Sequence, residues 1–255
     1  MQAGHEANNS VSNSLKILTG LLIVMFPVGL FLMISDWGKQ FLWTSSLFLA
    51  LQAVITFIYL SRLAEIKSVI TVTVLILIIS FIIELLGLNT GFPFGHYSYT
   101  NVLKPFIGDV PIAISFAWFV VSVNSVLISK YFLKGNFTIA VISSVFILAG
   151  DILLEPFASF VNNYWVWAEG SIPIQNFLSW LIIGFIFSVL INKTLKWRDD
   201  FKNERKMLML PFLITGINVS TYSIINLIYG YYEITIAGLL IFAILLLSLI
   251  KLKPK

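Results

Sequence analysis

The stretch "ITVTVLILIISFIIELLGLNTGFPFGHYSY", from Ile70 to Tyr99, contains both the apolar run and the interruption that decide the fold. Its first part is almost entirely apolar, and about 20 such residues suffice for a helix to cross a bilayer. From Glu84 onward the stretch has a carboxylate, three glycines, a proline, a histidine and four aromatic residues. It therefore predicts a transmembrane helix that runs into an unusual loop.

The composition extends this prediction to the whole chain of 255 residues. Hydrophobic residues make up 58% of it and charged residues only 11%, whereas soluble domains have about 25% charged residues. The chain is therefore predicted to be an integral membrane protein with one domain. It has no cysteine, which excludes disulfides and thiolate metal sites. The net charge of +4 is attributed to loop lysines and arginines, so no nucleic-acid partner is expected.

Eight apolar segments of membrane-spanning length follow one another without a soluble block between them. We expect an all-α, polytopic membrane helix bundle of about eight transmembrane helices, with seven as the lower number. The seventh segment is the weakest because polar residues such as Asn218 and Thr221 interrupt it, so it is expected to face the bundle interior. The expected segments are 15–34, 41–60, 66–86, 111–130, 137–155, 172–192, 207–229 and 234–250. This domain, 15–250, would lie between a polar N-terminal tail, 1–14, and a basic C-terminal tail, 251–255.

Lysine and arginine residues are unevenly distributed between the two sides of this map. With eight spans, fourteen of the 16 fall on the side of the N-terminus, and only Lys39 and Lys104 fall on the other. Six of the fourteen lie in 193–206. The charged segment 195–206 is expected to be a solvated connector that touches anionic lipid headgroups, the alternative being a partner-binding site. Because cytoplasmic loops are enriched in lysine and arginine, both termini are predicted to be cytoplasmic, in a multi-pass protein of the cell membrane.

Three carboxylates lie near the non-cytoplasmic ends of two expected spans. Glu84 is near the end of the third segment, and Asp151 and Glu155 are near the end of the fifth, which runs in the same direction. Asp151 and Glu155 are four residues apart and share a helix face. A carboxylate inside a span costs about 2.5–3.5 kcal/mol, which makes it a candidate functional group. The alternative is that these groups only bond backbone N–H groups of the next loop, and Asp109 is expected simply to cap the fourth helix.

Aromatic residues crowd the two loops that follow these carboxylates. The segments 87–110 and 156–171 are predicted to be re-entrant or lid loops, the alternative being an aromatic belt at the membrane interface. The residues singled out in and around them are Phe94, His96, Tyr97, Trp165, Trp167 and Asn176, together with Trp118 in the fourth segment. His96 is either a donor that helps to place water or a hydrogen-bonded structural residue. A lone histidine without cysteines supplies too few ligands for a transition metal, so no metal site is expected.

Carboxylic acids and aromatic faces in an apolar pocket suit one kind of chemistry. An acid can protonate an electron-rich alkene, and aromatic faces can stabilise the resulting tertiary carbocation by cation–π attraction. A carboxylate or an amide can then hold a water molecule that captures the cation. The expected substrate is an isoprenoid dissolved in the membrane.

Five motifs between about residues 80 and 185 carry a resemblance to a known family. They are "ELLGLNTGFPFGHYSYT", "GDVPIAISFAWF", "DILLEP", "YWVW" and "IPIQNFLSW". In this order they resemble the successive motifs of the carotenoid biosynthesis protein family, whose characterised members are carotenoid 1,2-hydratases of the bisanhydrobacterioruberin hydratase type. The resemblance implies water addition to the terminal double bond of a ψ end group, which gives a tertiary alcohol without a redox cofactor.

The resulting prediction is a cofactor-independent membrane hydratase, a hydro-lyase, with a lipophilic acyclic carotenoid and water as substrates. The predicted catalytic residues are Glu84, Asp151 and Glu155. The predicted substrate-binding residues are Phe94, His96, Tyr97, Trp118, Trp165, Trp167 and Asn176. The alternatives are a carotenoid cyclase or isomerase and a non-enzymatic carotenoid-binding or transport protein. Other enzymes of the carotenoid pathway are possible protein partners.

Overall fold

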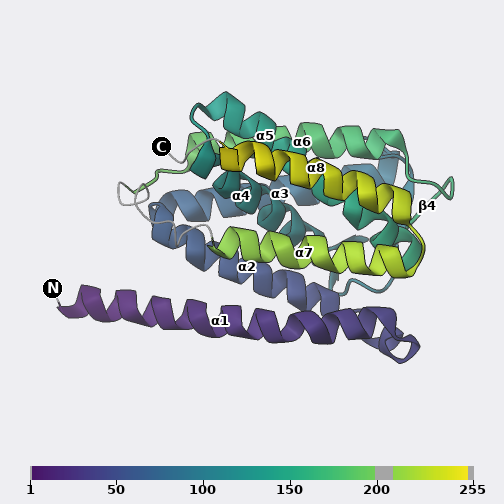
Figure 1. Cartoon of the computed structure of the whole chain (residues 1–255), viewed down its shortest axis with the longest axis horizontal. Helices are drawn as coiled ribbons and strands as arrows, with labels where there is room; N and C mark the ends of the chain where they lie inside the picture. The colour runs from purple at the N-terminus through teal and green to yellow at the C-terminus, as the bar shows by residue number, and fades with distance from the viewer. Residues whose placement is uncertain (1, 199–208, 252–255) are drawn as a thin grey trace.

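The computed structural model describes residues 2–198 and 209–251, and over this part of the chain it is a helix bundle with two small β-ribbons (Figure 1). The α-helices are α1 (Gln2–Ile34), α2 (Thr44–Leu63), α3 (Ile66–Thr90), α4 (Ile112–Phe132), α5 (Asn136–Glu155), α6 (Ile174–Thr194), α7 (Met209–Ile228) and α8 (Tyr232–Lys251). A 3-10 helix, η1 (Asp36–Phe41), follows α1, and a π-helical turn, η2 (Pro156–Val161), continues α5. The strands are β1 (Tyr97–Tyr99), β2 (Phe106–Ile107), β3 (Val110–Pro111) and β4 (Trp165–Trp167).

The prediction of an all-α membrane bundle is confirmed. Seven helices of the described residues are long and apolar enough to cross a membrane, and the shorter apolar stretch Tyr232–Ser248 lies in α8. The second span was expected at 41–60, three residues too early, because Asp36–Phe41 forms η1 instead. The Ser35 side chain fixes this turn by accepting a hydrogen bond of 3.1 Å from the Gly38 N–H. The polar residues that precede the first span are also helical, since α1 begins at Gln2.

The ends of the described chain lie at one end of the bundle and the aromatic loops lie at the other. Helix α1 begins and α8 ends at one end, as an even number of passes requires, and β4 lies at the opposite end (Figure 1). We call that opposite end the loop end. The assignment of the termini to the cytoplasm stays a prediction. Most of the charged connector (199–206) and the last residues of the basic tail (252–255) lie outside the described residues.

Burial distinguishes the central helix from the peripheral one. Within their membrane segments, 78% of the residues of α4 are buried, but only 6% of those of α1. Helix α4 packs against α2, α3, α5, α6 and α7, whereas α1 contacts mainly α2 and η1. Figure 1 accordingly shows α1 along one edge of the bundle, next to α2 and α7. The aromatic loops at the loop end therefore cover a core that is built around α4.

The two aromatic loops pair with each other at the loop end. β1 and β4 run antiparallel, with Tyr97 opposite Trp167 and Tyr99 opposite Trp165. Successive side chains of a strand point to opposite faces, and the intervening Val166 is 48% exposed. We call this pair of strands the aromatic ribbon, because its four alternate aromatic residues turn inward. The chain reaches it through Gly91, which ends α3 with a φ of 74°, a conformation that favours glycine.

The prediction that Asp109 caps α4 is wrong. Asp109 is exposed in the turn between β2 and β3, and the residue at the N-cap of α4 is Pro111, which makes no side-chain cap. The hairpin pairs Ile107 with Val110, so Asp109 belongs to its turn and lies too far from the first helical N–H groups.

Replacement of Gly38 tests the turn that joins α1 to α2. A Cβ atom at Gly38 would overlap the backbone of Leu32, which cannot move aside as a side chain can. We expect Gly38→Ala to lower the free energy of unfolding by about 1–3 kcal/mol, as overpacking does in other cores. Thermal unfolding of the detergent-solubilised protein measures this effect. Gly20→Ala is the control, because nothing lies within 4 Å of a Cβ there, and a melting temperature of Gly38→Ala equal to that of the control would contradict the prediction.

Candidate active site

Glu84 lies in the last turns of α3, where it is buried beneath the aromatic ribbon. Its Oε2 atom accepts hydrogen bonds from the hydroxyls of Tyr97, at 2.6 Å, and Tyr99, at 2.7 Å. Its Oε1 atom accepts a hydrogen bond of 3.2 Å from the Trp118 indole. Gly87, one turn further on, allows this approach, because a Cβ there would lie 3.0 Å from the Tyr97 hydroxyl. Three donors from two loop residues and α4 therefore hold this carboxylate.

The two tyrosines act as donors under the conditions of the site. Burial first, and then the negative charge of Glu84, raise the pKa of the Tyr97 and Tyr99 phenols above its ordinary value. Both phenols therefore stay protonated at neutral pH, and their O–H groups donate hydrogen bonds to the Glu84 carboxyl group. Their rings are also packed edge to face, with centroids 5.4 Å apart.

Glu155 is held in a similar way at the end of α5. Its Oε2 atom accepts hydrogen bonds from the indoles of Trp165, at 3.3 Å, and Trp167, at 3.0 Å. Because these residues alternate along β4, both indoles face inward and reach the same oxygen. The pairing of the strands also brings the ring of Tyr97 to 5.3 Å from that of Trp167. The aromatic ribbon thus supplies donors to both carboxylates, Glu84 from β1 and Glu155 from β4.

Asn176, in the first turn of α6, joins the two carboxylates of α5. Its amide nitrogen donates to Glu155 Oε1 at 2.9 Å and to Asp151 Oδ2 at 3.1 Å. Asp151 and Glu155 are each 1% exposed. The other oxygen of Asp151, Oδ1, has no hydrogen-bond partner among the described residues. This pair therefore has one buried oxygen that is free to accept or carry a proton.

A pocket of about 870 Å³ lies beneath the aromatic ribbon, and its lining is mainly apolar. It contains most of the residues that the sequence singled out. The predicted site residues that line it are Glu84, Phe94, Tyr97, Glu155, Trp165, Trp167 and Asn176. The two carboxylates therefore face one chamber from α3 and α5.

Three predicted site residues lie outside this chamber. Asp151 lines a neighbouring cavity of about 610 Å³, which shares residues such as Leu154 and Trp180 with the pocket. Trp118 is fully buried behind the wall, where it stacks on Trp180 with ring centroids 3.9 Å apart. His96 is exposed, and its ring lies against Gly91. The structure thus brings neither Trp118 nor His96 into the lining of the pocket.

Several lining residues were not among the predicted site residues. They include Tyr99 and Tyr164 in the loops, Trp180 on α6, Ser45 and Phe48 on α2, and Asn218, Thr221 and Tyr222 on α7. Two signals in the sequence could have found some of them. The triplets "YSY" and "WVW" alternate as strands do, which places Tyr99 beside Tyr97. Trp180 follows Asn176 by four residues, and so shares its face of α6.

The pocket has aromatic and amide donors but no cation at its carboxylates. Among the side chains that the structure describes, the ion pairs are Lys39 with Asp36 and Lys196 with Glu65, and neither involves Glu84, Asp151 or Glu155. Within the same residues, no group of three or more His, Cys, Asp or Glu side chains could hold a metal ion. The donors that fix the two carboxylates are therefore the side chains of tyrosine, tryptophan and asparagine. Such a site can hold an apolar ligand against two carboxyl groups.

Comparison with known proteins links the chain to one pathway. The profile of the carotenoid biosynthesis protein family matches residues 44–245, which extend from α2 into α8. A curated relative, bisanhydrobacterioruberin hydratase of Haloarcula japonica, is 26% identical over 146 residues, which are 54% of this chain and 48% of the relative. The chain thus spans about half the length of the curated relative that it matches, and no solved structure matches it. Since the profile covers most of the sequence, the chain belongs to the carotenoid biosynthesis protein family.

Proposed function

We propose that this protein is a hydratase that adds water across the terminal double bond of an acyclic carotenoid inside the membrane. The observation that carries the proposal is the pocket itself, in which Glu84 and Glu155 face an apolar, aromatic chamber of about 870 Å³. An apolar polyene fits such a lining, and the carboxyl groups are the only side chains of the lining that can exchange a proton readily near neutral pH. The name of the Haloarcula japonica relative supports hydration as the reaction.

Glu155 is the carboxyl that we place against the reacting alkene. It lines the pocket, whereas Asp151 opens onto the neighbouring cavity. Protonated Glu155 donates its proton to the less substituted carbon of the terminal double bond, so that a C–H bond forms and a tertiary carbocation remains. Asp151 shares the Asn176 amide with Glu155 and has one free oxygen, which suits it to take up the proton released when water captures the carbocation and to pass it back to Glu155.

The aromatic ribbon is the group that we expect to stabilise the carbocation. Trp165, Trp167 and Tyr97 line the chamber beside Glu155. The face of an aromatic ring attracts a cation by about 2 kcal/mol when both are desolvated. Glu84 lines the same pocket, where three donors keep its carboxyl group in place, and in its ionised form it would add a negative charge that favours the carbocation.

Water completes the reaction by capturing the carbocation. A C–O bond forms to the tertiary carbon, and the oxygen then loses a proton to a carboxylate, so that the acid is regenerated and the product is a tertiary alcohol. The polar groups of the lining that can hold this water are Asn176, Thr221 and the hydroxyls of Ser45 and Tyr164, which are 2.6 Å apart. The atoms balance without an oxidant or a reductant.

Product analysis in a host that accumulates lycopene tests the reaction class. Expression of this protein is expected to yield a pigment heavier by one water molecule, or by two if both ends react, and growth in H₂¹⁸O is expected to place the heavy oxygen in the new hydroxyl. A product of unchanged mass would show that the reaction is cyclisation or isomerisation rather than hydration. Purified membranes that bind lycopene and a shorter acyclic polyene but convert neither would indicate a carotenoid-binding or transport protein instead.

A further inference from the structure

We propose that the substrate enters the pocket sideways from the bilayer, through an opening between α1, α2 and α7. The opening then holds the polyene chain while the end of the chain reacts. The identity of this occupant depends on the proposed function, whereas the existence of the opening depends on the geometry alone.

A side cavity, whose empty space of about 570 Å³ includes its open mouth, lies between α1, α2 and α7. It is lined by the segment of α1 between Met25 and Met33, by Thr44, Ser45 and Phe48 at the start of α2, and by Thr221 of α7. Four of these residues also line the pocket that contains Glu84 and Glu155, namely Met33, Ser45, Phe48 and Thr221. The side cavity and the pocket therefore share a wall made of these four side chains, and a displacement of that wall would join the two spaces.

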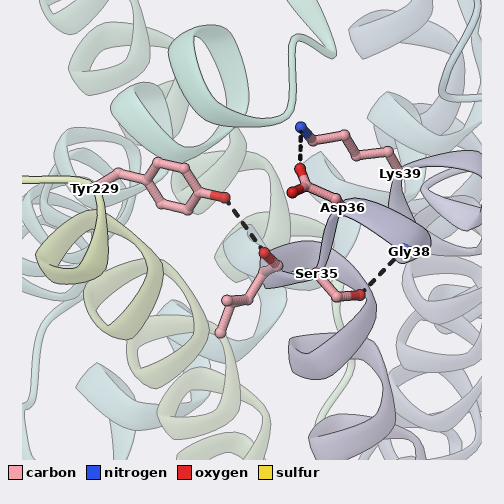
Figure 2. Close-up of polar contacts among 6 residues, drawn as sticks. Ser35, Asp36, Gly38, Lys39 and Tyr229 are labelled. Carbon is pink, nitrogen blue, oxygen red and sulfur yellow. Dashed lines mark hydrogen bonds and ion pairs between the residues drawn. The ribbon is translucent and has the colours of Figure 1, made fainter.

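Helix α1 covers this side cavity but packs loosely. Only 6% of its membrane segment is buried, against 44% for α2. It is tied to the bundle at the loop end, where Tyr229 donates a long hydrogen bond of 3.5 Å to the carbonyl of Ile34 and η1 begins directly afterwards (Figure 2). Gly29 lines the side cavity, and nothing lies within 4 Å of the position of a Cβ there, so there is room for a larger side chain at this position.

The chemistry of the lining identifies the occupant as an apolar chain. None of the residues around the side cavity is charged, and its polar groups are hydroxyls. The Ser45 hydroxyl is already bonded to that of Tyr164, and that of Thr44 to the carbonyl of Phe41. A peptide or a polar headgroup would find no charged partner here. A polyene has one end that must reach Glu155 and a long apolar remainder, and the uncharged lining of the side cavity suits that remainder.

A matched pair of tryptophan substitutions tests the opening through activity. Gly29 and Gly20 are both in α1, and both have empty space around a Cβ, but only Gly29 lines the side cavity. We expect Gly29→Trp to fill the opening and to lower kcat/KM for lycopene by about tenfold or more. Gly20→Trp is expected to leave kcat/KM unchanged. Equal kcat/KM values for both variants and the parent would overturn the proposal.

A binding measurement separates the opening from the reaction. The chain has no cysteine, so Gly29→Cys and Gly20→Cys each create a single thiol that N-ethylmaleimide can alkylate in detergent. Lycopene is expected to slow alkylation at position 29 but not at position 20. This result would hold even if lycopene were bound without being hydrated, in which case only the proposed function fails. Hydration without protection at position 29 would overturn the opening, and protection at both positions would assign lycopene to the outer surface of α1 instead.

Discussion

Replacement of Glu155 by glutamine is expected to lower turnover of an acyclic carotenoid by about a hundredfold or more, the range for loss of a general acid. The amide keeps the size of the side chain but has no acidic proton to give to the alkene. In this variant an NH₂ group replaces one of the two Glu155 oxygens. One oxygen accepts a hydrogen bond from Asn176 and the other accepts hydrogen bonds from two indoles. The NH₂ group would therefore face an N–H group in either orientation of the amide. The measurement is the rate of product formation per inserted protein.

The control for this variant is Glu65→Gln at the other end of the bundle. Glu65 is 61% exposed and 3.9 Å from Lys196, and such exposed pairs contribute about 0–1 kcal/mol. Its replacement is expected to leave turnover unchanged. Thermal unfolding and co-purified carotenoid show whether Glu155→Gln is folded and binds substrate. If the folded variant turned over at the parent rate, Glu155 would not be the acid. If the variant failed to insert, Asp151→Asn, which leaves Glu155 in place, is expected to slow turnover by removing the proton reserve.

Removal of the aromatic face of Trp167 is expected to have the second-largest effect. Trp167 is 4% exposed, lines the pocket and bonds Glu155 through its indole N–H. Trp167→Leu removes both the face and the N–H group, and the loss of about 2 kcal/mol of cation–π stabilisation corresponds to about a thirtyfold decrease in kcat. Trp167→Phe keeps a face and removes only the N–H group, so we expect a smaller decrease.

The ratio between these two variants separates the two roles of Trp167. A kcat for Trp167→Phe as low as that for Trp167→Leu would assign the effect to the bond with Glu155 rather than to the carbocation. Parent-level kcat in both variants would remove Trp167 from the reaction. Trp37→Leu is the control, because Trp37 is 62% exposed in η1 and does not line the pocket. Its kcat is expected to equal that of the parent.

The sequence predicted the positions of those site residues that lie in helices. Glu84 lies near the end of α3 and Glu155 ends α5, and these two helices run in the same direction, so the similar depth of the two residues follows from the order of the spans. Asn176 and Glu155 were expected near each other only because both lie at the loop end, and their hydrogen bond of 2.9 Å depends on the close packing of α5 on α6. The catalytic and binding roles of these residues stay predictions.

The loops were predictable in composition but not in arrangement. Nothing local indicates that Tyr97 pairs with Trp167, since 70 positions separate these two residues and only the packing of the helices brings them together. His96 illustrates the same limit. It precedes β1 directly, yet the turn at Gly91 holds its ring outside the chamber.

By itself, the sequence determined that this protein is a membrane helix bundle and that it resembles the carotenoid biosynthesis protein family. A span needs only about 20 apolar residues in a row, whatever its neighbours are, because the bilayer requires every backbone group to be bonded within the helix. The tertiary structure alone decided the aromatic ribbon, the division of Asp151 and Glu155 between two cavities, and the opening beside α1. Each of these depends on contacts between side chains far apart in the chain, and the position of such contacts is set by how the helices pack.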